Sequence, residues 1–219
     1  MEVPVRELRK DVIYTLASEA WKRARDGFWL WALSYLTLIP IDISSRFGGK
    51  LRGAPVLEAI GIIIFIVGLL WIYGASEEAV KFTPYPGSTL NKLAKTLGTA
   101  LLLAGLALLM GPFMGVLSLL LILFAVILAL AGLVYLIRLS GELGDTIRWR
   151  WLRPLVILLF LTSIILKIIP DPLALLVSDL AGVLTYALLA WASGEYAHYL
   201  EMRAKQVLVG PGTHTGAGI

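Results

Sequence analysis

Long runs of apolar residues, separated by short polar segments, dominate this chain of 219 residues. The apolar runs cover about residues 27–41, 56–74, 96–110, 115–137, 154–169 and 173–192. As helices, these runs cross all or most of a hydrocarbon core that is roughly 30 Å thick. The pattern predicts an all-α, polytopic membrane bundle of six transmembrane helices rather than a soluble globular fold.

The longest uncharged stretch has to hold two of these helices. Between Lys95 and Arg138 lie 42 residues without a charge, which would measure about 63 Å as one helix. Gly111-Pro112 marks the break, because proline cannot donate the helical hydrogen bond. Pro170-Asp171-Pro172 separates the last two runs in the same way. The six predicted spans therefore form three hairpins, over residues 27–74, 96–137 and 154–192.

The two ends of the chain differ from this membrane domain, which we place at residues 27–200. In residues 1–26, apolar positions recur at helical spacing among charged residues: Leu8, Val12, Leu16 and Ala20. This pattern predicts an amphipathic helix, either on the membrane surface or packed on the protein's own loops. Residues 201–219 end in a glycine-rich segment and are expected to form a flexible tail.

Composition supports a membrane protein and excludes much enzyme chemistry. Hydrophobic residues make up 58% of the chain and charged residues 16%, and the mean hydropathy is +0.84. The absence of cysteine excludes disulfides, thiolate metal sites and cysteine nucleophiles, and two histidines leave little for metal catalysis. We find no nucleophile, zinc or phosphate-loop motif. The expectation is therefore a protein that is not an enzyme and holds no cofactor or metal.

The distribution of lysine and arginine predicts the orientation. Six spans divide these residues into 15 on the side of both termini and 4 on the other side. By the positive-inside rule, both termini lie in the cytoplasm and the protein is a multi-pass protein of the cell membrane. The formal charge of +4 is thus explained by orientation, and we expect no nucleic acid partner.

The hairpins also carry a repeated pattern. Each first helix begins at a basic residue seventeen positions before a proline: Arg23 and Pro40, Lys95 and Pro112, Arg153 and Pro170. Each second helix ends in Ser-x-Glu, at Glu78, Glu142 and Glu195. One interpretation is a threefold hairpin repeat around a pseudo-threefold axis. The alternative is that any membrane hairpin uses a basic start, a proline turn and a polar exit.

The layout of the spans and the segment from Tyr135 to Asp145 resemble small archaeal multi-spanning integral membrane proteins of unknown function. That resemblance implies a membrane location and no particular activity. A thermophilic source agrees with it, because the chain has one asparagine, one glutamine and no cysteine.

Ionisable residues near the outer ends of the spans are the first candidate site. Asp42, Glu58, Lys167 and Asp179 all fall in the outer third of the predicted bundle. Charges in a membrane are costly and are often functional, so these residues are candidate contacts for an ion or solute in an outward-facing vestibule. The alternative is structural, with Lys167 pairing with Asp179 or Asp171 to join two helices.

The Ser-x-Glu exits supply the second candidate site. If the repeat is real, Glu78, Glu142 and Glu195 form a cytoplasmic carboxylate ring of the kind that selects cations in channels. The alternative is that these are solvated helix ends whose charge has no function.

Two functions remain open from the sequence. The first is a non-catalytic subunit or scaffold of a membrane complex, with membrane lipids, other membrane subunits or a second copy of itself as partners. Small residues recur at helix-packing intervals, Ala100 with Ala104 and Ala125 with Ala129 and Gly132. They serve the packing of the bundle itself first and that of a partner's helix second. The second is a small channel or carrier for a cation or small solute. The scarcity of polar groups at mid-membrane depth argues against a pump.

Overall fold

The structure is a computed structural model that describes residues 9–46, 53–110, 115–169 and 171–209, apart from the side chains of five of them, Asp42, Ser45, Arg46, Pro172 and Val209. Within those ranges the chain is all-helical, as predicted, and contains no strand. The helices are α1 (Lys10–Leu36), α2 (Ile39–Arg46), α3 (Ala54–Phe82), α4 (Pro84–Met110), α5 (Gly115–Thr146), α6 (Leu152–Ile168) and α7 (Pro172–Val209).

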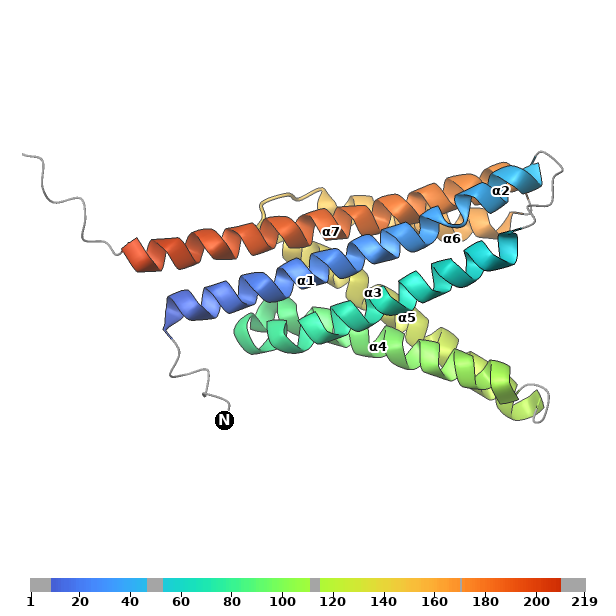
Figure 1. The fold of residues 1–219 in the computed structure, drawn as a ribbon, viewed down its shortest axis with the longest axis horizontal. Helices are drawn as coiled ribbons and strands as arrows, with labels where there is room; N and C mark the ends of the chain where they lie inside the picture. Colours follow the sequence, from blue (N-terminus) through green and yellow to red (C-terminus); the bar gives the residue numbers. More distant parts are fainter. Residues whose placement is uncertain (1–8, 47–52, 111–114, 170, 210–219) are drawn as a thin grey trace, which may run out of the picture.

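The long helices run roughly along one axis of the molecule (Figure 1). Helices α1 and α7 lie antiparallel and form the most extensive interhelical interface. The α4–α5 hairpin packs on α3 at one end and diverges from the other helices toward its turn (Figure 1). The beginning of α1 and the end of α7 lie at the same end of the molecule, as an even number of membrane crossings requires.

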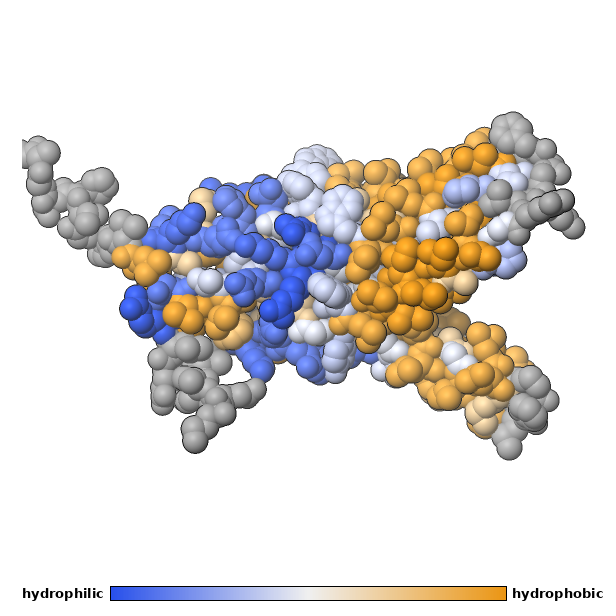
Figure 2. Space-filling model, viewed as in Figure 1, coloured by the Kyte–Doolittle hydropathy of each residue, from blue (hydrophilic) through white to orange (hydrophobic). Residues whose placement is uncertain are grey.

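Polar and apolar residues separate along this axis (Figure 2). The end that holds the start of α1 and the end of α7 is largely hydrophilic, and the opposite end, including the tip of the α4–α5 hairpin, is largely hydrophobic. We call these ends the polar half and the apolar half. Such a division along the helix axes is expected of a protein that is partly embedded in a membrane.

Four helices are long and apolar enough to cross a membrane: α3, α4, α5 and α7. Helix α6 is shorter, with 17 residues, and α1 carries many charged residues in its first half. The structure thus supports a membrane-embedded helical protein, and four of the six predicted spans correspond to helices that are long and apolar enough to cross a membrane. Within their most apolar windows, 17% of α5 is buried against 50% of α7, so α5 presents most of its apolar surface outward.

Helix α1 has no break at residue 26. The predicted amphipathic segment and the first predicted span are one continuous helix from Lys10 to Leu36. The apolar face of its first half packs within the protein, because Ala17, Trp21 and Ala24 are fully buried. The Trp21 indole N–H donates to Thr83 Oγ1 at 3.1 Å. Residues 17–24 thus pack within the protein, whereas Val12 of the predicted apolar face is 38% exposed.

The last helix likewise continues beyond its predicted span. Helix α7 extends to Val209, so residues 201–209 of the predicted flexible tail are helical. Leu200 and Ala204 are buried at a helical interval, and α7 packs along α1, which explains the extension. Residues 1–8 and 210–219 lie outside the described residues.

The predicted turns agree with the helix boundaries. Helix α4 ends at Met110 and α5 begins at Gly115, while α6 ends at Ile168 and α7 begins at Pro172. The first predicted span differs, because α1 ends at Leu36 and a short helix, α2, follows it. At that end Thr37 Oγ1 donates to the Ser34 carbonyl at 2.7 Å.

The three hairpins do not meet equally. The first and third are joined by the long α1–α7 interface, whereas the α4–α5 hairpin meets the first mainly through α3 and the third through small contacts of α5 with α6 and α7. The threefold repeat therefore stays a sequence pattern, and the described helices do not surround one central axis in equal pairs.

Candidate functional site

The structure brings Lys167 and Asp179 together, which the sequence offered as one possibility. Lys167 Nζ on α6 lies 3.4 Å from Asp179 Oδ1 on α7. The Asp179 side chain is 2% exposed, while that of Lys167 is 44% exposed. The pair therefore joins two helices within the apolar half and leaves the ammonium group accessible.

Glu58 and Lys167 line one groove. This groove has a volume of about 380 Å³ and lies between α1, α3, α4 and α6, with Ser34 and Tyr35 contributing its other polar groups. Lys167 Nζ also lies 5.2 Å from the centre of the Tyr35 ring, a distance at which a cation is attracted to an aromatic face. Two of the four outer candidates thus line this groove, and Asp179, which does not line it, pairs with Lys167. The side chain of Asp42, the fourth, lies outside the described residues.

An aromatic cluster adjoins the groove. Phe65, which lines it, stacks on the fully buried Trp31 with ring centres 5.1 Å apart. Tyr186 of α7 packs edge-on against Trp31 at 5.2 Å. These rings fill the space between α1, α3 and α7 beside the groove, so that its polar groups meet a packed apolar core.

The three glutamates of the predicted ring have different surroundings. Arg23 donates to Glu78 Oε1 at 2.8 Å, which links α1 to α3. Glu142 is engaged in a separate network, and Glu195 is exposed. Among the described residues, no group of three or more Asp, Glu or His side chains is placed to hold a metal ion.

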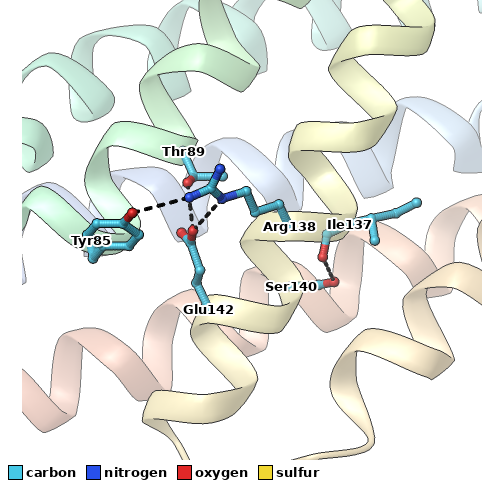
Figure 3. A network of polar contacts seen from close by, with 6 residues as sticks. All are labelled: Tyr85, Thr89, Ile137, Arg138, Ser140 and Glu142. Carbon is cyan, nitrogen blue, oxygen red and sulfur yellow. Dashed lines mark hydrogen bonds and ion pairs between the residues drawn. The ribbon is translucent and has the colours of Figure 1, made fainter.

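The network at Glu142 joins α4 to α5 (Figure 3). Arg138 Nε donates to Glu142 Oε1 at 2.8 Å, and Thr89 Oγ1 donates to the same oxygen at 3.0 Å. The Arg138 guanidinium also reaches the Tyr85 hydroxyl at 3.4 Å. Arg138 and Glu142 are four residues apart on one helix, a spacing that predicts an ion pair. The contacts of this pair with Thr89 and Tyr85 of α4 could not be predicted from the sequence and are seen only in the folded structure.

Sequence reasoning missed a similar polar contact between α1 and α7. Lys22 forms an ion pair with Glu201, and Ser18 Oγ donates to the same carboxylate at 3.3 Å. No local sequence pattern predicts these contacts, because Ser18 and Glu201 are 183 positions apart in the chain. These contacts fix the two long helices to each other in the polar half.

A second, apolar groove lies where the α4–α5 hairpin leaves α3. It has a volume of about 330 Å³, almost no polar lining, and is formed by Phe65, Leu97, Ala100, Leu101, Ala104, Ile122, Ala125, Val126 and Ala129. The sequence had paired the alanines at 100 and 104 and at 125 and 129 as helix-packing positions. The structure places all four on this groove.

Three glycines of α3 and α7 are covered by the protein itself. A Cβ atom on Gly61 would meet Thr37, one on Gly68 would meet Trp31, and one on Gly182 would meet Tyr35, each at less than 3.0 Å. These glycines therefore serve the protein's own packing, while the alanine-lined groove remains open to a neighbour.

Comparisons with protein-family models, curated proteins and solved structures give no match to this chain, so that its function has to be inferred from its own residues.

Proposed function

We propose that this protein is a non-catalytic subunit or scaffold of a membrane complex, and that it holds an apolar helix of a partner membrane protein against its α4–α5 hairpin. The observation that carries the proposal is the alanine-lined groove at the base of that hairpin. In lipid, small residues allow helices to approach closely and associate through packing. A groove lined by four alanines and almost no polar atoms fits an apolar helix and offers no chemistry for catalysis.

The exposure of the hairpin supports this proposal. Beyond the groove, large apolar side chains of α4 and α5 are mostly uncovered, among them Leu108 at 77%, Leu109 at 73% and Val116 at 77%. Lipid covers such surfaces in a membrane, and the hairpin is also free to pack along another protein. The tip of the hairpin diverges from the other helices (Figures 1 and 2).

The proposed placement in the membrane follows the sequence. All six apolar runs cross the bilayer as three hairpins, with the polar half and both termini in the cytoplasm. Helix α6, with 17 residues, measures about 25 Å, which covers most of the hydrocarbon core. The common location of the described chain ends (Figure 1) supports an even number of crossings.

Affinity purification from native membranes in mild detergent tests the proposed role. We expect a second membrane chain to co-purify in stoichiometric amount, with its mass visible in the size of the particle. Ala129→Trp fills the groove and is expected to remove most of that chain. Leu119→Trp is the matched control, because Leu119 lies on the same helix, is 67% exposed and does not line the groove. A protein that purifies alone, or a partner that stays bound to Ala129→Trp, contradicts the proposal.

A small channel or carrier for a cation or solute is the second candidate. The groove that contains Glu58, Lys167 and Tyr35 favours it, because charged side chains within membrane segments often mark substrate paths. The aromatic cluster beside that groove argues against a continuous path. A lone monomer in the purification would favour this candidate, and loss of liposome flux in folded Glu58→Gln would then support it.

A further inference from the structure

Three arginines at the junction of α5 and α6 have no acidic partner among the described residues: Arg148 and Arg150 in the connection and Arg153 in the first turn of α6. Arg148, Arg150 and Arg153 form no ion pair or side-chain hydrogen bond with any residue that the structure describes. The other described arginines each contact a carboxylate or a hydroxyl group: Arg9, Arg23, Arg25, Arg138 and Arg203. The arginines without such a partner thus lie within six consecutive residues.

This connection is firmly held. The Trp149 amide donates to the Gly144 carbonyl at 2.8 Å, and the Leu152 amide donates to the Trp149 carbonyl at 3.1 Å. The Trp149 ring packs edge-on against Trp191 of α7 with centres 5.0 Å apart. Arg148 has a φ of 59°, a left-handed conformation that is uncommon for arginine and is often kept for a binding function. The arginines are therefore carried by a defined turn.

Two of these arginines line a small pocket. Its volume is about 130 Å³, and its lining includes Ser140, Trp149, Arg150 and Arg153. About 10–15 Å³ of such volume is enough for one water molecule, so the pocket has room for a polar group larger than water. Gly141 makes room for Arg153, because a Cβ there would lie 3.2 Å from the Arg153 Cδ.

The pocket lies where the polar half meets the apolar half. In Figures 1 and 2 the α5–α6 connection is near the middle of the long axis, where hydrophilic surface gives way to hydrophobic surface. Trp151 and Trp191 are 69% and 44% exposed, and tryptophan is enriched at the level of lipid headgroups. A ligand in this pocket would therefore be within reach of the membrane surface.

We propose that Arg150 and Arg153 bind the phosphate of an anionic phospholipid, with the tryptophans alongside its glycerol and upper acyl region. A guanidinium group pairs with phosphate oxygens through two parallel hydrogen bonds, and Ser140 adds a hydroxyl to the lining. Asp145 also lines the pocket and offsets one charge. The three arginines still leave the segment positive, which favours lipids with a net negative charge over zwitterionic ones. The inference rests on the membrane placement proposed above and is independent of a partner helix.

Native mass spectrometry of the full chain in detergent tests this site. The probes are dioleoyl phosphatidylglycerol and dioleoyl phosphatidylcholine, which share acyl chains and differ in charge. We expect the first bound molecule of the anionic phosphatidylglycerol to bind at least about tenfold more tightly than that of the zwitterionic phosphatidylcholine. Arg150→Gln/Arg153→Gln is expected to remove that difference. Both side chains are exposed, and an unchanged thermal unfolding temperature would show that the variant is folded.

Arg203→Gln/Lys205→Gln is the matched control, because it removes the same charge from the far end of α7. It should retain the preference for the anionic lipid. The proposal is overturned if Arg150→Gln/Arg153→Gln keeps the preference, or if the control loses it equally. It is also overturned if millimolar inorganic phosphate displaces the lipid, since the pocket would then be a site for free phosphate. None of these readouts depends on a co-purifying chain, so the site and the proposed scaffold role can fail separately.

Discussion

Replacing Trp31 by alanine is expected to lower the free energy of unfolding by about 3–5 kcal/mol. Trp31 is fully buried and contacts three aromatic rings, those of Phe28, Phe65 and Tyr186, at centre distances of 5.5, 5.1 and 5.2 Å. Its indole N–H donates to the Phe65 carbonyl at 3.1 Å. Alanine would leave a large cavity where α1, α3 and α7 meet and would remove that donor.

Thermal unfolding in detergent measures this effect, and a shift on the order of 10 °C is expected for a chain of this size. Trp29→Ala is the matched control on the same helix, because Trp29 is 45% exposed. Trp29→Ala should lower the free energy of unfolding by less than about a third of the loss in Trp31→Ala, as expected for a surface position. Equal losses for the two variants would show that Trp31 is not at the centre of the packed core.

Replacing Gly87 by alanine is expected to have the second largest effect, about 1–3 kcal/mol. A Cβ atom at Gly87 on α4 would lie 2.6 Å from the Ala79 carbonyl oxygen and 2.7 Å from its carbon. Those are backbone atoms of α3, which cannot rotate away as a side chain can. Helices α3 and α4 would have to separate at the junction where Thr83 accepts the Trp21 hydrogen bond.

Gly74→Ala on α3 provides the control, since nothing lies within 4 Å of a Cβ atom there. Alanine is favoured over glycine in a helix by up to about 1 kcal/mol, so this variant should unfold at the same or a higher temperature. If Gly87→Ala unfolds no earlier than Gly74→Ala, the close approach of α3 and α4 is wrong.

The helices and most turns of the apolar half were predictable from local sequence. Proline chemistry predicts helix ends at Gly111-Pro112 and at Pro170. Both lie outside the described residues, and the described helices α4 and α6 end just before them, at Met110 and Ile168. The continuity of α1 through residue 26 was not predictable, because a charged amphipathic segment has the same pattern whether it lies on lipid or on α7. Trp21 is buried against Tyr196 of α7, with ring centres 4.9 Å apart, so this part of α1 packs on α7.

The candidate site was predictable only where local sequence determines it. A lysine and an aspartate near the outer ends of successive spans predict a pair, and Lys167 meets Asp179. That Glu58 and Lys167 line one groove depends on how α3 packs on α1, which no local pattern encodes. The three Ser-x-Glu exits look equivalent in sequence, yet Glu78 and Glu142 bind different arginines because the hairpins pack unequally.

We propose that the apolar half lies in the membrane, with its turns outside the cell and the polar half in the cytoplasm. Single-cysteine labelling tests it most directly, because the chain has no native cysteine. We predict that a membrane-impermeant maleimide labels Gly115→Cys and Ile169→Cys in intact cells. Asp145→Cys and Lys205→Cys should react only after the membrane is permeabilised. Labelling of all four positions in intact cells, or the reverse pattern, would contradict this account.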